Sequence, residues 1–111
     1  MRDDQERLQD ILEAIAQVER YAIQGQIAFQ TDELIQVWIV HHLQIIGEAT
    51  ASLSREFIAQ HKDVPWPEII AFRNILVHEY FRIDLKTVWR VVERDLPVLK
   101  TKLKAIQSKR N

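Results

Sequence analysis

Apolar residues recur at steps of three and four along most of this chain, and that spacing limits its fold more than any other feature. The clearest run lies in the C-terminal third, at Leu85, Val88, Trp89, Val92, Leu96, Leu99, Leu103 and Ile106. Residues spaced in this way form one stripe on an α-helix, whereas a half-buried strand would alternate at every second position. Only two Gly and three Pro interrupt the 111 residues. The pattern therefore predicts an all-α protein and argues against a turn-rich β-sandwich or barrel.

We predict an up-and-down bundle of four main helices and one short helix, forming a single domain over residues 1–111. Thr31 or Asp32 is expected to cap the second helix, and Asp84 the last one. Pro97 lies inside the last helix and must kink or restart it, with Asp95 as a local cap. A domain of this size is marginal alone, so pairing with a second copy would help. The expected ranges are about 4–22, 31–51, 54–61, 67–77 and 84–106.

Composition excludes several classes of protein. The chain has no cysteine, so disulfides, thiolate metal ligands and cysteine nucleophiles are all excluded. No apolar run approaches the ~20 residues that a membrane-spanning helix needs. The first residues are too charged to open a secretory signal, so we expect a cytoplasmic protein. The formal net charge of −1 shows no global basic field, which argues against a tight, non-specific nucleic-acid binder but leaves room for a local basic site.

The segment Arg73-Asn74-Ile75-Leu76-Val77-His78-Glu79-Tyr80 is the candidate for chemistry. Asn74 and His78 lie four positions apart and share a helix face, so the Asn amide could orient the imidazole. Tyr80 would lie under Arg73 if the helix continued, away from His78. Convergence of all three therefore requires that the helix end near His78, or that two chains share the site.

Arg73 and His78 together suffice for RNA cleavage without a metal. An imidazole exchanges protons near neutral pH, so His78 would take the proton of a ribose 2′-OH or supply one to the leaving 5′-oxygen. A guanidinium matches phosphate oxygens and would stabilise the developing charge. The products would be a 2′,3′-cyclic phosphate and a 5′-OH, and DNA would be inert. A structural ion pair or a capped helix end is the alternative interpretation of the same spacing.

Other polar residues have competing interpretations. Glu48 follows Gly47 on a surface of small residues where another helix could approach, so it could pair with Arg73, with a partner chain, or simply at the surface. His41 and His42 point about 100° apart on a helix and cannot readily bind one metal. We expect core or dimer packing for Trp38, Trp66 and Trp89, and a solvated basic face for Lys100, Lys102, Lys104, Lys109 and Arg110.

The octet resembles the HEPN superfamily, and specifically its HepT-like toxin branch, in its Arg-x-x-x-x-His-x-Tyr arrangement with Asn directly after the Arg. The resemblance covers about residues 43–106, and the residues before it match only as a helix of the right length. The matching positions are Ile46-Gly47-Glu48-Ala49, Val64-Pro65-Trp66, Ile69, Arg73-Asn74, Leu76-Val77-His78, Tyr80-Phe81, Asp84, Val88-Trp89 and Asp95-Leu96-Pro97.

The resemblance implies a homodimeric helical bundle in which two motifs face one cleft. It implies a metal-independent ribonuclease toxin without a cofactor, in which Arg73 and His78 are catalytic and Asn74 and Glu48 support them. It also implies an antitoxin, a nucleotidyltransferase of the MntA type, that transfers AMP to Tyr80. The chain lacks the Gly-Ser…Asp-x-Asp signature of that enzyme, so it resembles the toxin half. A non-catalytic nucleotide- or RNA-binding adaptor dimer is the alternative.

Overall fold

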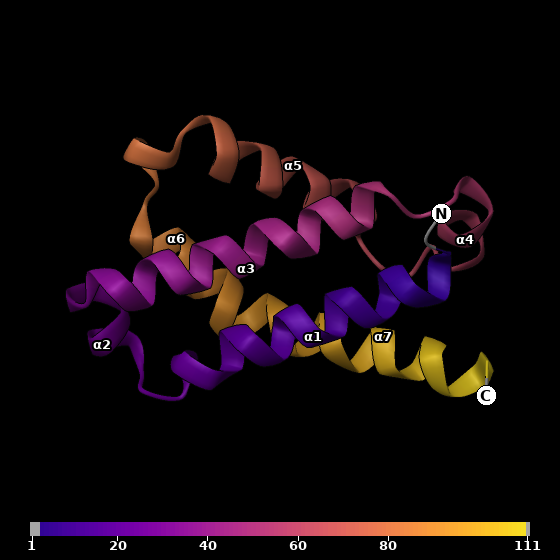
Figure 1. The fold of residues 1–111 in the computed structure, drawn as a ribbon, viewed down its shortest axis with the longest axis horizontal. Coiled ribbons are helices and arrows are strands. Elements are labelled where there is room, and N and C mark those ends of the chain that lie inside the picture. Colours follow the sequence, from indigo (N-terminus) through magenta and orange to yellow (C-terminus); the bar gives the residue numbers. More distant parts are fainter. Residues whose placement is uncertain (1–2, 111) are drawn as a thin grey trace.

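The computed structural model describes residues 3–110 and is helical throughout its regular structure, without strands in that range. Four long helical segments form the bundle, as the apolar spacing predicts (Figure 1). None of the helices described is long and apolar enough to cross a membrane. The elements are α1 (Asp4–Ala22), α2 (Gln26–Thr31), α3 (Glu33–Ala51), α4 (Arg55–Gln60), α5 (Trp66–His78), η1 (Tyr80–Arg82), α6 (Leu85–Arg90), η2 (Val91–Asp95) and α7 (Leu96–Arg110).

Side-chain caps set where several helices begin. The Asp32 carboxylate accepts hydrogen bonds from the backbone N–H groups of Leu34 and Ile35, which confirms Asp32 as the cap of α3. The Asp84 side chain accepts from the Lys86 N–H at the start of α6, as predicted. The start of α4 is tied to the start of α1, because the Ser54 N–H and hydroxyl both donate to the Asp4 carboxylate.

Two local features differ from the sequence prediction. The six-residue helix α2 fills the connection after Gly25, whose φ of 98° ends the preceding turn. Asp95 is not a cap but belongs to a π-helical turn, in which the Leu96 N–H donates to the Val91 carbonyl. Pro97 lacks an N–H of its own, and the wider turn just before it lets the helix continue into α7 rather than restart.

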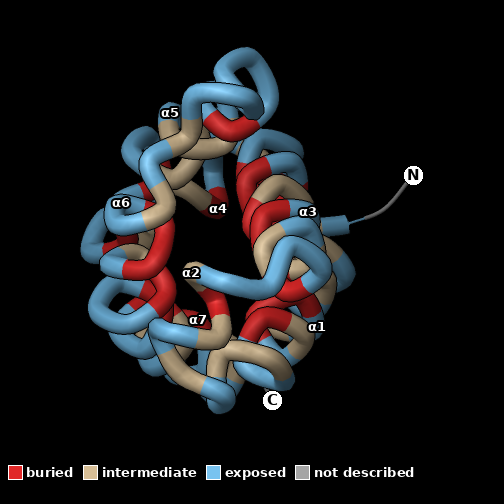
Figure 2. Tube along the Cα trace, turned by 90° about the vertical axis from the view of Figure 1, so that its left-hand side faces the viewer, coloured by how far each residue is buried: buried red, intermediate tan, exposed pale blue. Residues whose placement is uncertain are grey.

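The helices enclose a continuous apolar core between α1, α3 and α6–α7, as the end-on view shows (Figure 2). Trp66 and Trp89 are buried, and the partly buried Trp38 donates its indole N–H to the Gln17 carbonyl at 2.8 Å. Core packing is therefore confirmed for these tryptophans. In contrast, within residues 3–110 α5 makes its extensive contacts only with α3.

The basic tail lies on the outside of α7, as expected. Lys100 donates to both carboxylate oxygens of Glu19 at 3.0 Å, and Lys102 donates to the Asp63 carbonyl. Lys104 and Lys109 are exposed, and the side chain of Arg110 lies outside the described residues.

Candidate functional site

The end of α5 provides the first requirement of the candidate site. The helix stops at His78, because Glu79 leaves helical geometry with φ −124° and ψ 34° while its N–H still donates to Ile75. The chain then turns into η1, which begins at Tyr80. Of the two conditions for bringing Arg73, His78 and Tyr80 together, the helix end near His78 is therefore met within one chain.

Arg73 is held by its stem and by its guanidinium. A Cβ built on Gly47 would lie 2.2 Å from Arg73 Cβ and 2.6 Å from Arg73 Cγ, so only glycine permits this approach of α5 to α3. At the other end of the side chain, Nη1 donates to Asn74 Oδ1 at 3.0 Å and Nη2 lies 3.8 Å from Glu48 Oε1. The Nε of Arg73 is buried and has no hydrogen-bond partner among residues 3–110. Because Nε is buried, the donors left over for a ligand are the remaining N–H groups of Nη1 and Nη2.

Asn74 does not have the contact that the spacing predicts. Its amide oxygen accepts from Arg73, and His78 has no hydrogen bond or ion pair within residues 3–110. The long Arg side chain folds back over its own turn of helix and takes the amide. We therefore correct the assignment of Asn74: it orients the guanidinium and does not orient the imidazole.

Glu48 lies beside Arg73, which was one of its predicted positions. Its side chain is 54% exposed and that of Arg73 is 31% exposed, so water screens the pair. Exposed pairs of this kind stabilise folding little, by ~0–1 kcal/mol. The contribution of Glu48 is therefore to limit where the guanidinium lies.

Tyr80 lies in the open, next to the end of α5. It is 42% exposed, and its ring meets the Phe81 ring edge-on at a centroid distance of 5.5 Å. Both rings line a shallow groove against Val37 and Val40 of α3. Phe81 is 98% exposed, an unusual position for a large apolar side chain.

No group of three or more potential metal ligands occurs among the residues that the structure describes. The rings of His41 and His42 lie nearly perpendicular, with centroids 5.0 Å apart. His42 Nδ1 lies 2.8 Å from the Trp38 carbonyl oxygen, so this ring forms a hydrogen bond within its own helix.

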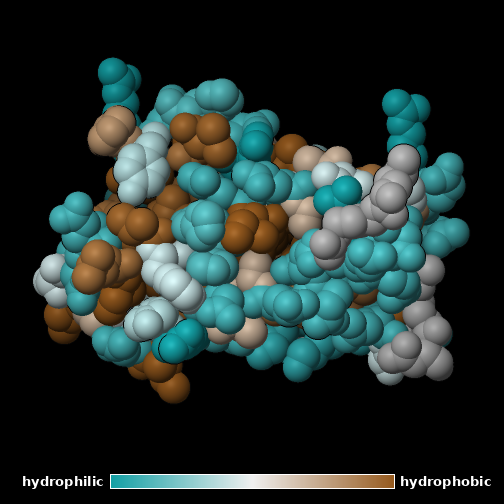
Figure 3. Space-filling view, in the orientation of Figure 1, coloured by the Kyte–Doolittle hydropathy of each residue, from teal (hydrophilic) through white to brown (hydrophobic). Residues whose placement is uncertain are grey.

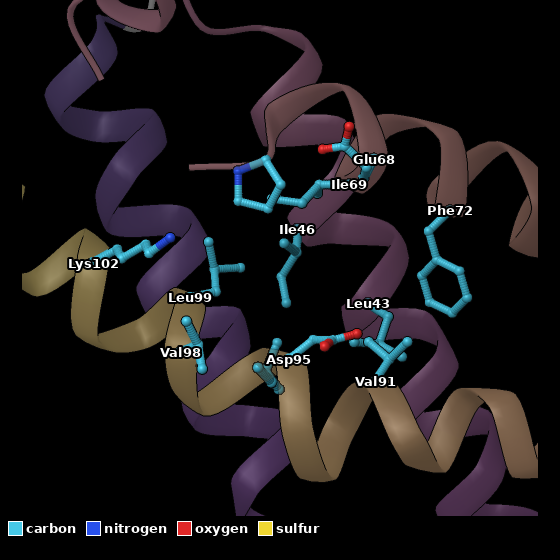
Figure 4. A pocket seen from close by; sticks show the side chains of 12 residues that line it. Leu43, Ile46, Glu68, Ile69, Phe72, Val91, Asp95, Val98, Leu99 and Lys102 are labelled. Atoms are coloured by element: carbon cyan, nitrogen blue, oxygen red, sulfur yellow. The ribbon is translucent and has the colours of Figure 1, made fainter. Parts of the chain in front are cut away.

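A groove that the sequence did not reveal lies between α3, α5 and the η2–α7 segment (Figure 4). It has a volume of about 400 Å³, and its walls are apolar, including Ile46, Phe72 and Leu99. Glu68, Asp95 and Lys102 add charged groups to its lining. None of the predicted site residues lines it, so it is separate from the Arg73–His78 segment.

Comparison with known proteins finds similarity over most of the chain. The family model "Ribonuclease HepT-like" matches residues 11–106, which begins well before the 43 that the motifs alone indicated. A protein of Thermococcus cleftensis named "Probable ribonuclease HepT" is 33% identical over 109 residues, covering 96% of this chain and 97% of that protein. A "Putative RNase" of Caldanaerobacter subterraneus is 37% identical over 81 residues, covering 73% and 72%. No solved structure matches the chain.

Proposed function

This chain belongs to the HepT-like ribonuclease family, and on that basis we propose that it is a metal-independent endoribonuclease toxin that cleaves RNA with Arg73 and His78. One observation carries the proposal: the stem of Arg73 packs against Gly47 while its guanidinium donates to Asn74 with donors to spare, and an imidazole with no partner among residues 3–110 ends the same helix. The two residues lie roughly 7.5 Å apart along the helix axis, five rises of 1.5 Å. Five residues at 3.6 per turn also rotate His78 by about 140° around the axis from Arg73, so the two side chains would approach one phosphodiester from different sides.

The reaction uses the two groups differently. Arg73 binds the non-bridging phosphate oxygens and stabilises the charge that accumulates there when the 2′-oxygen attacks phosphorus. His78 exchanges a proton with the attacking 2′-OH or with the departing 5′-oxygen. The P–O5′ bond breaks, which leaves a 2′,3′-cyclic phosphate and a 5′-OH. Asn74 and Glu48 hold the guanidinium in place, as positioning residues.

We propose a homodimer in which the two motifs face one cleft. Large apolar side chains are exposed around the start of α3 and in η1, where Leu34 is 80% and Phe81 is 98% exposed. Apolar surface gathers at that end of the molecule (Figure 3). Exposed large apolar side chains gathered at one end of a molecule are typical of an interaction site. Burial of Phe81 against a second copy would bring the adjacent Tyr80 and His78 to the interface.

We propose that a partner nucleotidyltransferase silences the enzyme through Tyr80. The phenolic oxygen would attack the α-phosphorus of ATP, forming an O–P bond and releasing pyrophosphate. Tyr80 is accessible and lies two residues after His78. The attached AMP would add bulk and negative charge at the cleft and repel an RNA phosphate.

Cleavage of labelled RNA in EDTA tests the catalytic proposal. We expect a cyclic-phosphate product from the wild type, and its loss in both Arg73→Ala and His78→Ala. Arg90→Ala replaces an exposed arginine of α6 and is the matched control, expected to cleave normally. RNA binding without product in the folded wild type would favour a non-catalytic adaptor instead.

A further inference from the structure

The packing of α3 against α5 places a second histidine near the candidate site. The two helices run antiparallel in a register that three contacts define. Gly47 lies against Arg73, and Gln44 Nε2 donates to the Leu76 carbonyl at 3.5 Å. One turn further, Val40 and Tyr80 line the same groove. This register places His41 opposite Glu79, one residue after His78, so the two histidines lie within about one helical rise of 1.5 Å of each other along the helix pair.

The two histidines also lie on the same side of the helix pair. His41 precedes Glu48 by seven residues, almost two full turns, so the two side chains share a face of α3. Glu48 is the group that pairs with Arg73 from that face. On α5, His78 follows Asn74 by one turn, so these two side chains share a face of the helix. Asn74 accepts the hydrogen bond from Arg73 on that face. His41 is exposed, as is His78.

We propose that His41 is a further catalytic residue, and that His41 and His78 divide the two proton transfers of RNA cleavage between them. This inference rests on the proposed ribonuclease function. Helices in contact lie 8–10 Å apart, so imidazoles on neighbouring helices can flank one phosphodiester. Cleavage needs a base at the 2′-oxygen and an acid at the 5′-oxygen, on opposite sides of phosphorus. One imidazole takes the 2′-OH proton, the other gives its proton to the 5′-oxygen, and solvent resets both.

His42 supplies a matched control. It neighbours His41 in sequence, but its Nδ1 contacts the Trp38 carbonyl and its ring lies 4.5 Å from the Trp38 ring. Its side chain faces α1 across a different groove, lined by Asp10, Glu13 and Gln17. His42→Gln therefore removes the ring that meets His41 edge-on at a centroid distance of 5.0 Å, but it leaves the His41 imidazole in place.

The experiment compares His41→Gln, His78→Gln and His42→Gln on two RNAs. The second RNA carries sulfur in place of the bridging 5′-oxygen at the cleavage site, and a thiolate leaves without protonation. We expect His41→Gln and His78→Gln each to lose about 10²–10⁴-fold on ordinary RNA, as for an acid–base group. Exactly one of the two should recover on the sulfur RNA, because only the general acid becomes dispensable. His42→Gln should stay close to the wild type on both RNAs.

Three results would overturn the inference. If His41→Gln cleaves ordinary RNA at the same rate as His42→Gln, then His41 takes no part in the reaction, and the proposed function stays intact. Recovery of both impaired variants on the sulfur RNA, or of neither, would show that they do not divide acid from base. A wild type that cleaves no RNA would overturn the proposed function and this inference with it.

Discussion

The contact between Gly47 and Arg73 gives a quantitative test of how the site is built. In Gly47→Ala, the new methyl group would overlap the Arg73 Cβ at 2.2 Å, and neither helix backbone can yield at that point without moving α5. Overpacking of this kind costs about 1–3 kcal/mol of folding free energy. The displaced Arg73 would also leave Asn74 and Glu48, so RNA cleavage should fall.

Gly47→Ala should instead raise the free energy of unfolding once the Arg73 side chain is absent. In Arg73→Gly the next atom that the Gly47 methyl group meets is the residue-73 Cα at 3.5 Å, an ordinary contact. Alanine is then favoured over glycine inside α3 by about 0.8–1 kcal/mol. The double-mutant cycle therefore predicts a coupling free energy of ~2–4 kcal/mol between the two positions.

Urea unfolding measures the free energies of unfolding of the wild type, the two single variants and the double variant. All four are measured at one protein concentration, because the stability of a dimer would depend on concentration. Gly25→Ala is a poor comparison, since Gly25 has positive φ, so Ala16→Gly at an exposed position inside α1 serves as the propensity control. Equal destabilisation by Gly47→Ala in both backgrounds would refute the packing argument. An unchanged cleavage rate in folded Gly47→Ala would refute the link from packing to the site.

Three further outcomes follow from the contacts described. Glu48→Gln should lower cleavage far less than Arg73→Ala, because the Arg73–Asn74 hydrogen bond persists; equal losses in an RNA cleavage assay would contradict this. If the proposed dimer forms, Leu34→Ser or Phe81→Ser should weaken it, and sedimentation that shows no loss of association would place the interface elsewhere. Asp84→Ala should lower the unfolding free energy by about 1 kcal/mol through the lost cap of α6, measured by urea unfolding.

The long elements were predictable because each has its own local signal. The apolar stripe of α1 and the capping side chains of Asp32 and Asp84 are written in neighbouring residues, and the structure confirms them. The short helix α2 has no such signal, since only Phe29 is buried in it and six residues show no period. The π turn before Pro97 has no local signal besides the proline itself, so sequence alone favoured a kink with a cap.

The candidate site was likewise predictable from the sequence only in part. The small residue Gly47 predicted a close approach of another helix, and Arg73 is the residue found there. The partner of Asn74 was wrong, because spacing shows which side chains share a face but not which of two neighbours the amide contacts. The level of His41 relative to His78 depends on the antiparallel register of α3 and α5, which no local pattern encodes.

The support of α5 is uneven along its length. Trp66 anchors the start of α5, since it is 2% exposed and donates its indole N–H to the His61 carbonyl at 2.9 Å. In the middle of the helix, Arg73 packs closely against Gly47. Beyond Arg73 the helix stays packed on α3 as far as Leu76, which is fully buried and whose carbonyl accepts from Gln44. Residues 77–82 are then all exposed. The imidazole of His78 and the phenol of Tyr80 therefore have room to adjust to what they bind, whereas the stem of Arg73, packed against Gly47, does not.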